Sequence, residues 1–129
     1  MFAIFQKHKN TNEDDSTNDS SQALIIRSVF ESGDDFGSED ELVSLRQLED
    51  NLDRIFADNN YDLDGHEIGD GEFVLYAYGD NVDRMLELAK EPLRESPFIW
   101  FNITLRYGAV DDENARETHT RVKLSTRDR

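Results

Sequence analysis

Two short segments of this chain carry apolar side chains that alternate onto both faces of a strand, and they constrain the fold more than any other feature. They are residues 23–30 (ALIIRSVF) and 73–78 (FVLYAY). Successive side chains of a strand point to opposite faces, so a strand that is apolar on both faces needs cover on both. Each segment is therefore expected to form an inner strand of a sheet.

The sequence between these strands predicts a helix that begins after Ser38. A Gly-rich acidic turn comes first, and Ser38 and Glu41 then have the spacing of a capping box. Apolar side chains follow at intervals of three or four residues, which places them in one stripe along the helix. The stripe consists of Leu42, Leu45, Leu48, Leu52, Ile55 and Phe56.

Residues 61–79 predict a β-hairpin whose second arm is the inner strand 73–78. Gly69, Asp70 and Gly71 supply the turn, and the polar first arm is typical of an edge strand. A second helix is expected to follow with Asp80 as its cap, and Pro92 is expected to kink or end it. Its inward positions are Val82, Met85, Leu86, Ala89 and Leu93.

Two more strands complete the pattern. Residues 98–107 form a long apolar run after Pro97, and an acidic loop at 111–114 leads to a last strand at 117–124. In the last strand the side chains alternate between two faces: Thr118, Thr120, Val122 and Leu124 face one way, and Glu117, His119, Arg121 and Lys123 face the other. This alternation is typical of an edge strand with one solvated face.

The order of these elements predicts an α+β fold, a ferredoxin-like βαββαβ unit with an extra C-terminal edge strand. The antiparallel sheet should have the strand order 2-3-1-4-5, counted from residue 22, with both helices on one face. In that order the two inner strands have neighbours on both sides, as their apolar faces require. A chain of 129 residues has the length of one domain, which we expect at residues 22–129.

Residues 1–21 are expected to form a flexible tail of acidic and polar composition. Residues 10–21 contain no apolar side chain and so cannot offset their ordering entropy by burial. The apolar start of the tail, residues 1–5 (MFAIF), fits an added edge strand, a short anchor against the domain or a frayed end. We favour the frayed end.

Acidic residues are concentrated in the middle of the chain. Residues 31–80 contain sixteen acidic and two basic residues, a net charge of −14 out of −15 for the whole chain. The surface that they form projects a negative field, which favours a cationic partner. An acidic surface that only maintains solubility is the alternative. The residues expected to bind the partner are Asp34, Asp35, Glu39, Asp40, Glu41, Asp62, Asp64, Glu67, Asp70 and Glu72.

The composition argues against several classes of function. The chain has no cysteine, which excludes disulfides, thiolate zinc sites and cysteine nucleophiles and suits a reducing compartment. It contains no apolar run as long as a membrane span and nothing like a secretory signal, so we expect a cytoplasmic protein without a membrane partner. The only concentration of lysine and arginine is mild and C-terminal, so no nucleic-acid partner is expected.

Residues 60–71 match the EF-hand calcium loop only in part. Gly71 occupies the last position of the loop, where a closing glutamate is required. His66 lies beside three acidic residues, but potential zinc ligands this close on an extended arm point to alternate faces. We therefore expect no metal site. The residues that do match the calcium loop are Asn60, Asp62, Asp64 and Gly65.

No catalytic residue and no cofactor are predicted. The three histidines, His8, His66 and His119, lie in the expected tail, hairpin and edge strand, and no nucleophile-elbow, phosphate-loop or dinucleotide motif accompanies them. Acidic pairs are frequent in so acidic a chain and do not specify a general acid and base.

With both helices on one sheet face, the other face is expected to expose apolar and aromatic side chains. A contiguous patch of this kind commonly marks an interface. A second copy of the chain, another protein, a small hydrophobic ligand or residues 2–5 would fit it, and we favour self-association. The alternative is that these rings are only half-buried on an open face. RNA is not expected, because the glycine and basic motif of RNA-binding sheets is absent. The patch consists of Val74, Tyr76, Tyr78, Phe98 and Trp100.

Residues 36–108 resemble a family of small, uncharacterised bacterial proteins. The resemblance rests on FGSEDELVSLRQLEDNL, YDLDGHEIGDGEFVLYAYG, DNVDRMLELAKEPLRESP and LRYG, and the hairpin DGHEIGDGE is its most specific part. The resemblance implies no activity and no functional residues.

These patterns predict a non-enzymatic protein-interaction module, in its most concrete form an acidic immunity or antitoxin-type inhibitor of a basic protein. Tyr61 or His66 would supply a desolvated anchor. The alternative is a dimeric small-molecule-binding or regulatory domain that uses the aromatic sheet face. A third hypothesis is an enzyme of unrecognised type.

Overall fold

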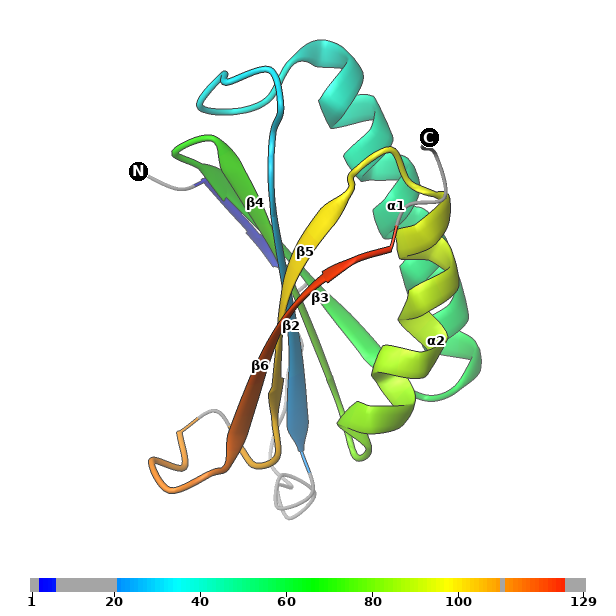
Figure 1. Ribbon diagram of the computed structural model, residues 1–129. Helices are drawn as coiled ribbons and strands as arrows, with labels where there is room; N and C mark the ends of the chain where they lie inside the picture. The colour runs from blue at the N-terminus through cyan, green and yellow to red at the C-terminus, as the bar shows by residue number, and fades with distance from the viewer. Residues whose placement is uncertain (1–2, 7–20, 110, 125–129) are drawn as a thin grey trace.

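Six strands and two helices form in residues 3–6, 21–109 and 111–124, the residues that the computed structural model describes. The strands build one antiparallel sheet, and both helices pack on the same face of it, so the fold is α+β (Figure 1). The strands are β1 (Ala3–Gln6), β2 (Gln22–Val29), β3 (Asp62–Gly69), β4 (Glu72–Gly79), β5 (Trp100–Arg106) and β6 (Glu117–Lys123), and the helices are α1 (Glu39–Asp58) and α2 (Val82–Glu95).

The strand order in the sheet is β1-β3-β4-β2-β5-β6, and every pair of neighbours is antiparallel. The two strands that are apolar on both faces, β2 and β4, lie side by side in its middle, as predicted. The five strands predicted from residue 22 onward occur in the order 2-3-1-4-5, but the sheet has a sixth strand.

The sixth strand, β1, corrects two expectations. Residues 3–6 pair with β3, with Ala3 opposite Ile68, so this segment is an added edge strand where a frayed end was favoured. Consequently β3 has a neighbour on each side and is not the edge strand that its polar sequence indicated. Strand addition uses backbone groups, which every sequence carries, so the composition of β3 does not reveal it. Of the predicted flexible tail at residues 1–21, residues 1–2 and 7–20 lie outside the described residues.

The capping box that begins α1 is confirmed. Ser38 Oγ accepts a hydrogen bond from Glu41 N at 3.1 Å, and Glu41 Oε1 accepts one from Ser38 N at 2.9 Å. The buried stripe of α1 lies against the sheet and contributes Leu45, Leu48, Leu52 and Phe56 to the core.

Helix α2 begins at a different cap from the one predicted and continues past Pro92. Its N-cap is Asn81, whose Oδ1 accepts a hydrogen bond from Arg84 N at 3.0 Å, and not Asp80. Pro92 does not end the helix, which continues to Glu95. Pro92 and Leu93 are both buried, and this burial stabilises the last turn although the proline lacks a backbone donor.

The two helices do not cover the whole width of the sheet. Helix α1 packs on β3, and α2 packs on β2, β4 and β5. Strand β6 therefore lies at the margin of the helical layer (Figure 1). All of its residues are exposed except Val122, which is partly buried.

Candidate functional site

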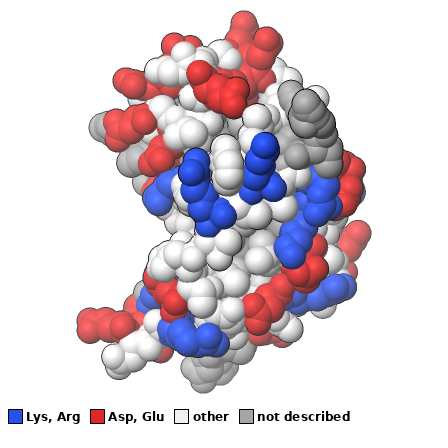
Figure 2. All heavy atoms as spheres, in the orientation of Figure 1, with Lys and Arg blue, Asp and Glu red and all other residues white. Residues whose placement is uncertain are grey.

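Two acidic stretches that are far apart in the sequence meet at one end of the molecule. The loop between β2 and α1 is bound to the β3–β4 turn by backbone hydrogen bonds from Gly71 N to Asp35 O at 2.9 Å and from Phe30 N to Gly71 O at 2.8 Å. Acidic side chains gather at this end in Figure 2, while Lys and Arg lie across the middle of the same face. We name five of the exposed carboxylates here the acidic end; they are Asp34, Asp35, Glu39, Asp40 and Asp70.

Glu41, Glu67 and Glu72, which belong to the ten predicted partner-binding acids, make hydrogen bonds or ion pairs within the fold. Glu41 accepts hydrogen bonds from Ser32 and Ser38. Burial raises the pKa of Glu41, but these hydrogen bonds outweigh burial and lower the pKa below its ordinary value. Glu67 accepts a hydrogen bond from Tyr76 Oη at 2.7 Å, and Glu72 lies 3.5 Å from Arg27 Nε.

Asp62 and Asp64 do not belong to the acidic end. They lie at the start of β3, where Asp62 is opposite Tyr78, whereas the β3–β4 turn follows the other end of that strand. Both carboxylates act on Tyr78: burial, and then the charges of Asp64 and Asp62, raise the pKa of its phenol. The sequence groups all ten acids because they are close in the chain, but an extended strand separates its two ends by its full length.

The predicted aromatic face is divided and not continuous. Val74, Tyr76 and Tyr78 lie along β4 on the helix-free face, but Val74 is fully buried. Trp100 lies on β5 of the same face and is 42% exposed. Strand β2 separates β4 from β5, and its Arg27 is exposed between Val74 and Asn102. A charged side chain therefore interrupts the expected apolar patch.

Phe98 corrects the prediction for this face. It belongs to the core beneath the helices, where its ring lies 4.8 Å from that of Phe73 in an edge-on arrangement. Strand β5 begins only at Trp100, so the two-residue alternation that grouped Phe98 with Trp100 does not extend back to it.

The titration of the Tyr76 phenol tests the environment of this side chain on the helix-free face. Burial, and then the hydrogen bond to Glu67, raise the pKa of Tyr76 from 10.0 to about 12. The folded state thus holds the phenol proton more tightly than the unfolded state does, so this contribution to stability is complete below pH 10 and is lost as pH rises from 10 to about 12. Urea denaturation measures the free energy of unfolding at each pH. Over that pH interval we expect this free energy to fall less for Tyr76→Phe than for the wild type. An unchanged slope would show that Tyr76 does not titrate in this way.

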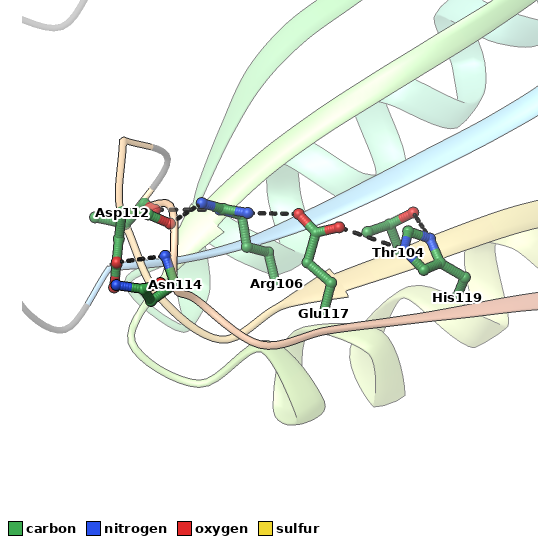
Figure 3. Close-up of polar contacts among 7 residues, drawn as sticks. Thr104, Arg106, Asp112, Asn114, Glu117 and His119 are labelled. Atoms are coloured by element: carbon green, nitrogen blue, oxygen red, sulfur yellow. Dashed lines mark hydrogen bonds and ion pairs between the residues drawn. The ribbon is translucent and has the colours of Figure 1, made fainter.

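A polar network on β5, β6 and their connecting loop was not predicted (Figure 3). Arg106 donates to Ala109 O at 3.1 Å, to Asp112 O and to Glu117 Oε2 at 2.5 Å. His119 Nε2 lies 3.3 Å from Glu117 Oε1, and His119 Nδ1 lies 3.0 Å from Thr104 Oγ1. The alternation of β6 placed Glu117 and His119 on one face, but only the strand pairing shows that Arg106 lies opposite Glu117.

The order hydroxyl, imidazole, carboxylate in this network also occurs in nucleophilic enzymes. Here the side chain of His119 is 67% exposed on an open strand face, which neither excludes water nor encloses a substrate. We therefore interpret the network as the fastening of the β5–β6 loop.

His66 lies on the helix side of β3, with Nδ1 at 2.5 Å from Glu49 Oε2 of α1. Tyr61 packs against the core and edge-on to Phe56. Neither residue projects from the surface as the desolvated anchor that was predicted. Within the described ranges no group of three or more His, Asp or Glu side chains is arranged to hold a metal ion.

Comparison of the chain with models of known protein families, with curated proteins and with solved structures finds no match. The resemblance of residues 36–108 to small bacterial proteins therefore stays a prediction. Neither helix in the described part of the chain has the length and apolar character needed to cross a membrane.

Proposed function

We propose that this chain is a non-enzymatic, cytoplasmic interaction module that binds a basic protein through its acidic end. The observation that carries the proposal is the backbone connection between the β2–α1 loop and the β3–β4 turn, which gathers carboxylates from Asp34 to Asp70 in one place. Gathered like charges strengthen the local negative potential, and such a potential accelerates the capture of a cationic partner.

The most specific form of this proposal is an immunity or antitoxin-type inhibitor. A cluster of carboxylates resembles a phosphate backbone in charge, so it can occupy the substrate site of a basic nuclease. The five residues of the acidic end are the contact candidates, since Glu41, Glu67 and Glu72 have partners within the fold.

The first experiment is an affinity capture from the lysate of the native cells at low and at high salt. A basic protein is expected to be retained at low salt and weakened at high salt, because salt screens exposed charges. Its association rate is then measured with the wild type, with Asp34→Lys/Asp35→Lys, and with Asp111→Lys/Glu113→Lys. Asp111→Lys/Glu113→Lys is the control pair: both residues are also exposed and their substitution changes the net charge equally, but they lie in the β5–β6 loop.

The Asp34/Asp35 variant is expected to associate about tenfold more slowly or worse and to show a flatter salt dependence, whereas the control pair changes the rate much less. Equal effects of the two pairs would mean that only net charge matters. An association rate that responds to neither salt nor charge reversal would rule out the acidic end as the binding surface.

We further propose that β2, α1, β3, β4, α2 and β5 form a ferredoxin-like unit, to which β1 and β6 are additions. The central order β3-β4-β2-β5 and the placement of both helices on one face support this assignment. The addition of β1 beyond β3 departs from the unit as the sequence predicted it.

The second candidate is a dimeric small-molecule-binding or regulatory domain that uses the helix-free face. The exposure of Trp100 (42%) and of Val29 (54%) favours it, since large apolar side chains exposed together often mark a binding surface. A ligand bound there would change the fluorescence of Trp100. If the fluorescence of Trp100 did not change when mixtures of metabolites were added, this would count against the candidate.

A further inference from the structure

Strand β6 ends the sheet with an open hydrogen-bonding edge in the described part of the chain. Open edges readily pair with a strand of another chain, and proteins protect them with proline, a bulge, a very short strand or charged side chains, lysine above all. The charged side chains of β6 are of both signs, with Glu117 at one end and Arg121 and Lys123 toward the other. Strand β6 has seven residues and no proline, and its pairing with β5 runs from Glu117 to Lys123 without a shift in register.

The direction of each backbone group in β6 follows from two hydrogen bonds at its ends. Leu124 N donates to Ile99 O at 3.2 Å, and Tyr107 N donates to Arg116 O at 2.8 Å. In an antiparallel strand the N–H and C=O of one residue point to the same side, and the side alternates along the chain. Even-numbered residues therefore bond to β5, and the outward-pointing groups belong to Glu117, His119, Arg121 and Lys123.

We propose that two copies of this chain pair through their β6 edges, antiparallel and about a two-fold axis at Thr120. Thr120 is the central residue of β6, so this register pairs the whole strand. It places Glu117 opposite Lys123 of the second copy and His119 opposite Arg121. Each of these residues has outward-pointing N–H and C=O groups, so each facing pair exchanges two hydrogen bonds.

The side chains of β6 fit this register on both faces. On the helix-free face, Glu117 faces Lys123 of the second copy, and opposite charges directly across an antiparallel pair are stabilising. On the helix side, Thr118 faces Val122, and Thr120 faces itself at the axis. Residues 81–129 contain nine acidic and nine basic residues, so this half of the chain adds little repulsion between two otherwise acidic molecules.

A groove beside β6 adds apolar surface next to the same interface. Because β6 lies at the margin of the helical layer, a space of about 170 Å³ is left between α2 and the sheet, lined by Leu86, Ile103 and Val122 among others. Pairing of the two edges brings Thr118 of the second copy against Val122 at the rim of this groove. The dimer thus covers part of an apolar surface that one copy leaves open.

A cysteine cross-link tests the register directly, because the native chain contains no cysteine. At the axis, Thr120 faces its own counterpart in a pair without mutual hydrogen bonds, with Cα atoms about 4.5 Å apart, which suits a disulfide. Thr120→Cys should therefore form a disulfide-linked dimer under mild oxidation. Thr118→Cys is the matched control, since it is equally exposed on the same face but lies roughly 13 Å from its counterpart. Equal cross-linking of both variants, or none of either, would overturn the proposal.

Sedimentation equilibrium measures the pairing without a cross-link. Lys123→Glu should weaken the dimer about tenfold, because it sets two like-charged pairs across the axis. Adding Glu117→Lys restores opposite charges across the axis and should recover part of the affinity, because the same substitution removes the ion pair of Glu117 with Arg106. A wild type that is monomeric at every concentration, or a dimer indifferent to Lys123→Glu, would refute edge pairing. Asp34→Lys/Asp35→Lys should leave the dimer unchanged, so failure here is distinct from failure of the acidic end.

Discussion

Phe56→Ala is expected to lower the free energy of unfolding by about 3–5 kcal/mol, the usual cost of removing a buried aromatic ring. Phe56 is fully buried in the last turn of α1, and its ring packs edge-on against Tyr61. Its carbonyl also accepts hydrogen bonds from the amides of Asn59 and Tyr61, so the end of the helix and the start of β3 are arranged around this residue. The truncation therefore leaves a cavity where two elements meet.

Urea denaturation of Phe56→Ala and of Val43→Ala checks this prediction. Val43 lies on the same helix but is 46% exposed, so its truncation should change the free energy of unfolding by no more than about 0.5 kcal/mol. If both variants lost similar stability, the buried stripe of α1 would be assigned incorrectly.

Gly79→Ala is expected to lower the free energy of unfolding by about 2–3 kcal/mol through steric overlap. A Cβ at Gly79 would lie 2.3 Å from Cδ1 of Tyr61 and 3.0 Å from Sδ of Met85. The Tyr61 ring cannot withdraw without losing its contact with Phe56, so the strain must spread into the core.

Gly71→Ala is the control for this second prediction. A Cβ at Gly71 meets nothing within 4 Å, but the residue has a φ of +82°, which costs about 1 kcal/mol for an L side chain. Thermal unfolding of the two variants compares the stability lost through steric overlap, at Gly79, with the stability lost through backbone strain alone, at Gly71. A larger loss at Gly71 than at Gly79 would contradict the packing around Tyr61.

The parts of the fold that local patterns determine could be predicted from the sequence. The two strands that are apolar on both faces lie in the middle of the sheet, and Ser38 and Glu41 form the expected capping box. The turn at Asp70 and Gly71 has the positive φ angles that these residue types favour. Each of these features depends on neighbours within a few residues.

The features that escaped prediction depend on contacts between distant residues or on where an element begins. The pairing of β1 with β3 is made by backbone groups that leave no signature in the sequence. Phe98 was placed on the wrong face because β5 begins two residues later. For the candidate site, the ten acids were identified by type, but their division between the two ends of β3 follows from the sheet register.

The hydrogen bonds that join the β2–α1 loop to the β3–β4 turn link main-chain atoms of Phe30, Asp35 and Gly71. Exchange of the neighbouring exposed side chains leaves these bonds in place. Related chains can therefore diverge at Asp34, Glu39 or Asp40 while they retain one framework. The same end of the molecule is a natural position for designed libraries, in which new recognition sequences are selected on an unaltered scaffold.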